Sequence, residues 1–255
     1  MKSVAIIPAR MGSSRFPGKP MKKIHGIPMI GHCYLRTKMC KDLFDTYVAT
    51  CDQEIYDYIK SINGKVVMTS TSHEMASDRA AEAMIKIEKE INSKVDIVVM
   101  VQGDEPMLTP QMISEALKPI MIDSSVNIVN LMANMKTTKE FEDPNEVKVL
   151  VDNLSNALYF SREPIPSKKK FSSEIPMLKQ VCIIPFRREY LLKFNSMKRT
   201  NLEIIESIDM LRLLENGEKV RMVMTDSLSY SVDTPEDLIN TQKAMENDPI
   251  MLLYK

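Results

Sequence analysis

Three cationic side chains lie on one short loop near the start of the chain: Arg10, Arg15 and Lys19. The loop follows residues 4–7, an apolar run rich in β-branched residues and too short for a free-standing helix, which predicts a buried strand that ends at Pro8. The small residues of the loop would let backbone N–H groups approach an oxyanion, and the cations would supply the countercharge. We interpret the loop as a triphosphate cradle at the end of a first parallel strand. A solvated basic surface loop is the other interpretation, and the loop matches neither the P-loop nor the GxGxxG pattern.

A carboxylate follows the most apolar segment of the chain, residues 95–101, in the motif VQGDEP. Because parallel strands carry ligands at their carboxyl ends, we expect Asp104 of this motif to lie beside the phosphates. Mg²⁺ takes one or two carboxylates together with substrate oxygens and water, so Asp104 suits a magnesium site. A tight turn that binds nothing is the alternative.

A second carboxylate, Asp233, lies in the motif SVDTPEDL at residues 231–238. We expect Asp233 to end a short strand and Thr234 to cap a helix that begins at Pro235. A capping box of this kind requires no function. Beside Asp104, however, Asp233 would complete a two-carboxylate metal site.

Two carboxylates and three cations at the edge of a sheet suit nucleotidyl transfer. A hydroxyl group of the acceptor would attack the α-phosphorus of a nucleoside triphosphate, and pyrophosphate would leave in line. The metal would lower the pKa of the attacking hydroxyl, and the cations would hold the departing pyrophosphate. The three histidines lie in no triad-like local motif, so no covalent nucleophile is expected.

The first half of the chain alternates strands with helices, which predicts an α/β fold with a doubly wound, mostly parallel sheet. We expect the segment at 95–101 to lie centrally in this sheet. The predicted strands cover 4–7, 46–50, 66–68 and 95–101, and the predicted helices cover 29–40, a segment capped by Asp52 and ended by Asn63-Gly64, and a segment that starts at Ser77 and Asp78.

From about residue 127 strands follow one another with few helices, which predicts a smaller antiparallel, β-rich subdomain. A long amphipathic helix is expected at 201–216 and a strand at 220–224. We divide the chain into a nucleotide-binding core (1–126), a β-rich insertion (127–200) and a return to the core (201–255). The predicted strands of the insertion cover 127–133, 146–152, 157–161 and 180–185.

The composition is that of a soluble globular protein: 255 residues, 44% hydrophobic, 27% charged and a formal net charge of zero. A neutral chain has no general attraction to nucleic acid or to anionic membranes. No signal peptide and no apolar run long enough to span a membrane are evident. Four scattered cysteines without CxxC spacing predict buried thiols in a reducing cytoplasm.

Several motifs resemble those of the CMP-Kdo synthetases, the 3-deoxy-manno-octulosonate (Kdo) cytidylyltransferases. Residues 7–20 fit IPARxxS[ST]RxPGKP, VQGDEP and VDTPEDL match in full, and DPNxVKV and ALYFSRxxIP occur at 143–149 and 157–166. The resemblance spans residues 7–238. It implies a Rossmann-like nucleotidyltransferase fold, Mg²⁺ as cofactor, CTP and a small acidic acceptor as substrates, and a cytoplasmic homodimer joined through the insertion. It also implies a place in lipopolysaccharide biosynthesis, with capsule and phosphonate metabolism left open.

The resemblance also assigns roles to residues. The implied catalytic residues are Arg10, Lys19, Asp104 and Asp233, and the two aspartates are the implied metal ligands. The implied nucleotide-binding residues are Pro8, Ala9, Arg10, Ser13, Arg15, Lys19, Thr69, Arg79 and Gly103, with Arg79 at the cytosine. The implied acceptor-binding residues are Gln102, Arg162, Gln180, Asp209 and Met210.

The chain departs from this family on the acceptor side. Residues 75–79 read MASDR instead of SGT[DE]R, 180–186 read QVCIIPF instead of HxGxYx[YF], and 208–212 read IDMLR instead of LEQLR. Gln180 and Met210 therefore replace a histidine and a glutamine that contact the sugar acid in the family. Methionine is unexpected beside a polyhydroxylated substrate, so another ulosonate or a small phosphonate of the phosphonoformate type is an alternative acceptor.

Two further alternatives concern the class of the protein. A nucleotidyltransferase of the same fold could use another base, although the VQGDEP motif argues against it. A non-catalytic nucleotide-binding or assembly protein is the other, and the presence of both Asp104 and Asp233 argues against that one.

Overall fold

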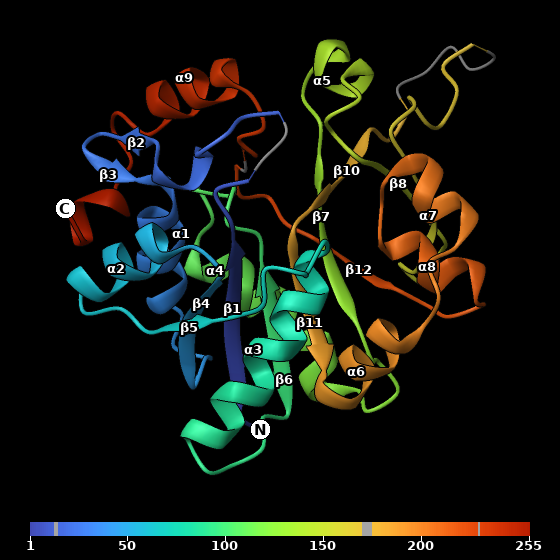
Figure 1. Cartoon of the computed structure of the whole chain (residues 1–255). Helices are drawn as coiled ribbons and strands as arrows, with labels where there is room; N and C mark the ends of the chain where they lie inside the picture. Colours follow the sequence, from blue (N-terminus) through green and yellow to red (C-terminus); the bar gives the residue numbers. More distant parts are fainter. Residues whose placement is uncertain (13–14, 170–174, 229) are drawn as a thin grey trace.

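A five-stranded sheet forms the first layer of the structure (Figure 1), and its strand order is β11-β6-β1-β4-β5. The computed structural model describes residues 1–12, 15–169, 175–228 and 230–255. The four strands from the first half of the chain are parallel, and β11 is antiparallel to β6. The bounds are β1 (Ser3–Ala9), β4 (Asp45–Thr50), β5 (Val66–Met68), β6 (Ile97–Val101) and β11 (Ile183–Arg187). The predicted fold class is confirmed, with β1 in the middle of the sheet and the fully buried β6 beside it.

Helices cover both faces of this sheet, which explains why its strands are apolar without alternation. Successive residues of β1 point to opposite faces: Val4 and Ile6 pack in the core under α3, whereas Ala5 and Ile7 pack under α1, α2 and α4. The bounds are α1 (Met29–Lys38), α2 (Gln53–Ser61), α3 (Ala76–Glu90) and α4 (Pro110–Ile122). A short 3-10 turn, η1 (Lys19–Met21), and a hairpin of β2 (Lys23–Ile24) and β3 (Ile27–Pro28) precede α1.

A second five-stranded sheet, of order β12-β7-β10-β8-β9, lies beside the first (Figure 1). It is antiparallel apart from the parallel pair β7–β12. The bounds are β7 (Val129–Asn134), α5 (Thr138–Glu142), β8 (Lys148–Val151), β9 (Ala157–Ser161), β10 (Leu178–Val181) and β12 (Arg221–Met224). The smaller antiparallel layer is therefore present, and β12 brings residues from beyond position 200 into it.

Three predicted elements differ in the structure. The strand expected at 180–185 is divided at Cys182, because β10 pairs with β7 in the second sheet and β11 pairs with β6 in the first. The helix expected at 201–216 is divided into α7 (Asn201–Glu206) and α8 (Met210–Glu215), because Ser207 adopts a left-handed conformation with φ 55°. Asp233 does not end a strand, since residues 231–233 pair with no sheet.

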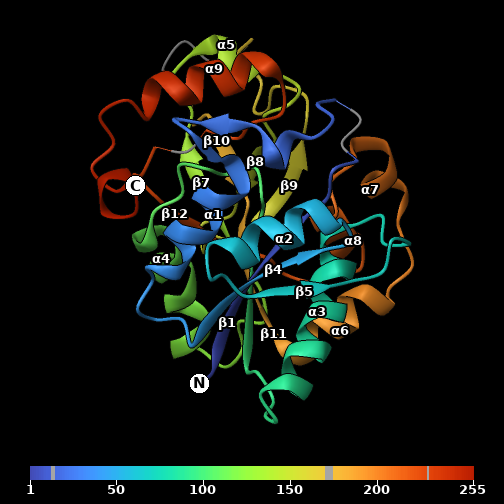
Figure 2. The same ribbon diagram turned by 60° about the vertical axis from the view of Figure 1, so that its left-hand side comes forward.

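The C-terminal tail packs back onto α1. It comprises α9 (Pro235–Ala244) and the turn η2 (Met251–Leu253), and α9 lies beside the β2–β3 hairpin (Figure 2). The buried Arg36 side chain pairs with Asp248 and donates a hydrogen bond from Nε to the Tyr254 hydroxyl at 2.9 Å. The Tyr254 hydroxyl also lies 2.7 Å from Nδ1 of His32, a fully buried side chain. These contacts anchor the tail to the first helix of the core.

The remaining helix, α6 (Arg188–Ser196), packs against α3 and β11. No helix in the described part of the chain is long and apolar enough to cross a membrane. The four cysteines are free thiols, as predicted. Cys33 and Cys40 are buried, whereas Cys51 and Cys182 are partly exposed, which differs from the expectation that all four are buried.

We expect protonation of His32 to destabilise the protein in mild acid. Burial lowers the pKa of His32 from 6.5 to about 4, so the unfolded state binds the proton more tightly, and the free energy of unfolding falls as the pH drops between these values. The complete loss is roughly 3 kcal/mol. Urea unfolding at several pH values should show a weaker pH dependence for His32→Gln than for the wild type and for the partly exposed control His25→Asn. An equal dependence in the wild type and His32→Gln would contradict this prediction.

Candidate active site

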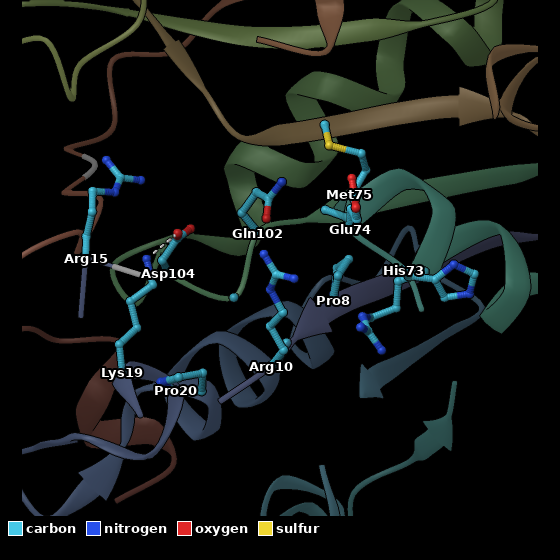
Figure 3. Close-up of a pocket in the computed structure, with 14 residues that line it drawn as sticks. Pro8, Arg10, Arg15, Lys19, Pro20, His73, Glu74, Met75, Gln102 and Asp104 are labelled. Carbon is cyan, nitrogen blue, oxygen red and sulfur yellow. Dashed lines mark hydrogen bonds and ion pairs between the residues drawn. The ribbon is translucent and has the colours of Figure 1, made fainter. Parts of the chain in front are cut away.

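A cavity of about 260 Å³ opens at the carboxyl ends of β1 and β6 (Figure 3). The loop after β1 supplies one wall, and the VQGDEP turn after β6 supplies another. Seven of the nucleotide-binding residues expected from the sequence line this first cavity: Pro8, Ala9, Arg10, Arg15, Lys19, Arg79 and Gly103. The loops after β1 and β6 thus meet at one cavity, because parallel strands place the loops that follow them at one edge of the sheet.

The Lys19 ammonium group lies between the two carboxylates that the sequence singled out. Its Nζ atom is 2.8 Å from Asp104 Oδ2 and 3.0 Å from Asp233 Oδ1, and it donates to the Val232 carbonyl at 2.8 Å. Burial by itself would lower the Lys19 pKa, but the charges of both aspartates and hydrogen bonds to them outweigh it and raise the pKa. Lys19 is therefore a fixed cation that joins residues far apart in the sequence.

Backbone contacts place Asp233 opposite Asp104. The Val232 N–H donates to the Asp104 carbonyl at 3.0 Å, which ties the C-terminal segment to the turn after β6. Thr234 caps α9 as predicted: its hydroxyl accepts the Asp237 N–H at 3.2 Å, and the Asp237 carboxylate accepts the N–H groups of Thr234 and Asp233. The capping box is thus real, and it also positions Asp233.

Gly103 allows the turn after β6 to approach the end of β1. A Cβ atom at this position would lie 2.9 Å from the Pro8 carbonyl oxygen and 3.3 Å from Ile30 Cδ1. Contacts shorter than those of real Cβ atoms would push the turn away from β1. The glycine therefore brings Asp104 within reach of Lys19.

The other two cations of the loop differ in their surroundings. Arg15 pairs with Asp233 at 2.9 Å and donates to Asn145 Oδ1 at 2.7 Å. Arg10 is exposed, extends toward Gln102 (Figure 3), and makes no hydrogen bond or ion pair with the described residues. Arg10 is therefore available to an anionic ligand.

Arg79 and Thr69 form one unit at the rim of the first cavity. Arg79 is 3% exposed and donates from one guanidinium nitrogen to the Thr69 hydroxyl at 2.5 Å and to the Ser70 carbonyl at 3.3 Å. Thr69 does not itself line the cavity, so it can act there only through Arg79. Ser13, the remaining predicted nucleotide-binding residue, lies outside the described residues.

A second cavity of about 360 Å³ adjoins the first and shares Arg10, Arg15 and Asp104 with it. Four of the predicted acceptor-binding residues line it: Gln102, Arg162, Gln180 and Asp209. Met210 differs from the expectation, because its side chain is fully buried in the core under α3 and lines neither cavity. Ser207 and Ile208 line the cavity instead, since the break between α7 and α8 turns them toward it.

Arg162 and Asp209 are two charged residues in the wall of the second cavity. Arg162 donates to the backbone carbonyls of Pro144, Glu206 and Ser207, so it connects β9 with the turn before β8 and with the end of α7. Burial raises the pKa of Asp209 to about 6, while the charge of Arg212 opposes the shift. Burial also raises the pKa of Glu146, so the cavity combines cations with two carboxylates that are weaker acids than usual, Glu146 and Asp209.

Sequence reasoning missed two residues that contact the loop after β1. Asn145 binds Arg15, and the Asp52 carboxylate accepts the Met11 N–H at 2.9 Å. The DPN motif pointed to Asn145 without giving its role. Asp52 was interpreted only as a helix cap, and nothing in the local sequence distinguishes the two uses of its carboxylate.

The family model for cytidylyltransferases matches residues 4–220. The chain belongs to the cytidylyltransferase family. A relative named 3-deoxy-manno-octulosonate cytidylyltransferase, from Geobacter metallireducens, is 40% identical over 93% of this chain and 95% of its own length. The protein of the same name from Geotalea daltonii is 42% identical over 93% of this chain and 96% of its own length.

A solved structure of CMP:2-keto-3-deoxy-manno-octonic acid synthetase complexed with CTP superimposes with a TM-score of 0.87. It is 35% identical, and the match covers 96% of this chain and 98% of that one. The cytidylyltransferase fold and the family resemblance expected from the sequence are therefore confirmed.

Proposed function

We propose that this cytidylyltransferase transfers CMP from CTP to Kdo and releases pyrophosphate. The observation that carries the proposal is the junction of the two cavities, where Lys19 joins Asp104 to Asp233. The curated relatives that share 40–42% identity bear the name of this activity.

The side chains at the junction suit an in-line displacement at the α-phosphorus. CTP would occupy the first cavity with its phosphates toward Arg10, Arg15 and Lys19, and the acceptor would occupy the second. The attacking hydroxyl and the α-phosphate then meet beside Asp104, which lines both cavities. Arg10, free of other partners among the described residues, and Lys19 would stabilise the charge that develops on the pyrophosphate.

The two carboxylates suit a magnesium ion. Lys19 engages one oxygen of each carboxylate, and within the described part of the chain the second oxygens, Asp104 Oδ1 and Asp233 Oδ2, accept no hydrogen bond. The described residues hold no group of three or more metal-ligating side chains, so protein ligands alone do not complete the site. Mg²⁺ takes one or two carboxylates and fills its shell with substrate oxygens and water, which fits this donor set. When bound, the ion would stabilise charge on the phosphates and acidify the acceptor hydroxyl.

Replacing Asp104 by asparagine should abolish turnover and leave the fold intact. We expect pyrophosphate release from CTP and Kdo to fall by about a thousandfold or more, because a charge that faces the reacting phosphate is lost. Continuous pyrophosphate detection measures this, and circular dichroism checks the fold. Asp226→Asn, at an exposed aspartate on the segment that leads to Asp233, is the matched control. Full activity of Asp104→Asn would refute the metal assignment.

The amide of Gln180 has a defined orientation in the second cavity. The buried Asn130 side chain donates from Nδ2 to the carbonyls of Val181 at 2.7 Å and Leu131 at 3.0 Å, which leaves its oxygen to accept from Gln180 Nε2 at 2.5 Å. The carbonyl oxygen of Gln180 therefore remains for a hydrogen-bond donor on the acceptor. A hydroxyl of a polyhydroxylated acid supplies such a donor, whereas ionised phosphonoformate does not. This orientation favours Kdo or another ulosonate over the small phosphonate.

Gln180→Leu should weaken acceptor binding and leave CTP use unchanged. We expect the KM for Kdo to rise about tenfold, because one hydrogen bond is lost and a hydroxyl of the substrate loses its partner. Steady-state kinetics with each substrate varied in turn measures this, and Gln111→Leu on the exposed face of α4 is the control. Efficient turnover of phosphonoformate with no turnover of Kdo would refute the proposed acceptor.

We further propose that the enzyme is a cytoplasmic homodimer joined through the second sheet. Free cysteines suit a reducing compartment. Large apolar side chains on the β8–β9 hairpin and on the adjoining α7 are 58–76% exposed: Leu154, Leu158, Ile204 and Ile205. Burial against a second copy would remove this surface from water.

Light scattering after size exclusion should therefore give twice the chain mass of 29.1 kDa. A charge placed in the apolar surface, as in Ile205→Glu or Leu158→Glu, should shift the protein to the monomer. Leu252→Glu, at an exposed residue of the C-terminal tail on the other side of the molecule (Figure 1), is the control. A wild-type monomer at micromolar concentration would contradict the proposal.

A further inference from the structure

Asp52 stands at the start of α2 but does not cap it. Its backbone is extended, as at a helix N-cap, yet its side chain makes no cap hydrogen bond to α2. Instead, Oδ2 accepts the Met11 N–H at 2.9 Å and lies 3.6 Å from Cys51 Sγ. The carboxylate is thus directed to the loop after β1.

Met11 is the point at which both ends of that loop are held. Its N–H is bound by Asp52, and its carbonyl accepts the Gly18 N–H at 3.0 Å. Gly18 reaches this position with φ +70°, a conformation that favours glycine. Arg10 precedes the held peptide and Lys19 follows Gly18, so the same contact fixes the backbone beside two cations of the first cavity.

The sheet itself cannot fix this part of the chain. The parallel pairing of β1 with β4 ends at Ala9 and Thr50, so no ladder hydrogen bond reaches Arg10 or Met11. Asp52 is two residues beyond the last pair, and its N–H donates to the fully buried Thr50 hydroxyl at 3.1 Å. A rigid strand end therefore holds the carboxylate that holds the loop.

We infer that Asp52 is a positioning residue of the nucleotide site, where its hydrogen bond to Met11 fixes the backbone that presents Arg10 to the phosphates of CTP. That the nucleotide is CTP rests on the proposed function. The charge of Asp52 cannot itself favour binding, because a carboxylate near a triphosphate repels it. Asp52 therefore contributes through the hydrogen bond that it accepts from Met11. The side-chain oxygen of an asparagine can accept the same bond.

The experiment is calorimetric titration of the full-length wild type and three variants with CTP and Mg²⁺, without acceptor. Asp52→Ala should bind CTP about tenfold more weakly, the loss expected for one hydrogen bond. Asp52→Asn should stay within about twofold of the wild type, because it restores the acceptor. Asp57→Ala is the control, since Asp57 lies on α2 and, among the residues that the structure describes, its carboxylate accepts only from the exposed Gln53. Melting temperatures should stay close together, because no cap bond of α2 is lost.

Steady-state kinetics should distinguish the same variants. For Asp52→Ala we expect a raised KM for CTP, with kcat at saturating CTP within about threefold of the wild type. Equal CTP affinity of Asp52→Ala and wild type would overturn the inference. So would an Asp52→Asn variant as weak as Asp52→Ala, because the charge and not the hydrogen bond would then matter. A wild type that binds no CTP would instead overturn the proposed function and, with it, this inference.

Discussion

The Lys19 ammonium group is held by Asp104 and Asp233, and the geometry of the site depends on these two ion pairs. The three residues come from a loop after β1, a turn after β6 and the segment before α9. The three side chains are only partly exposed, so each charge is favourable there because an opposite charge lies beside it. The contact therefore selects the arrangement in which the ends of β1 and β6 and the C-terminal segment meet.

The rest of the fold supports this contact from two sides. Gly103 allows the turn after β6 to lie against Pro8, and the Asp104 carbonyl accepts the Val232 N–H. Val232 packs in a small core with Ile24, Met29 and Met251, which belong to the β2–β3 hairpin, α1 and the C-terminal tail. The Arg36–Asp248 ion pair also holds the C-terminal tail against α1. A tail with no residue in either cavity thus helps to position the second carboxylate.

The acceptor side depends on the junction of the two sheets. At Cys182 the chain leaves the second sheet and enters the first, and the Gln102 N–H donates to the Cys182 carbonyl at 3.1 Å across this junction. The break at Ser207 turns residues 207–209 toward the same cavity and leaves Met210 in the core. Met210, which from the sequence weighed against a sugar acid, therefore lines neither cavity.

The sequence by itself determined the alternation of strands and helices and the places of the cationic loop and the two aspartates, because apolar periodicity, glycines and short motifs are local signals. It could not determine where β10 ends and β11 begins, since residues 178–187 are apolar enough for one strand and only pairing with different sheets divides them. It could not separate a capping Asp52 from one that holds Met11, because both need the same residue at the same helix start. Those choices belong to the tertiary structure, in which backbone groups left unpaired at the strand ends find acceptors on segments distant in sequence.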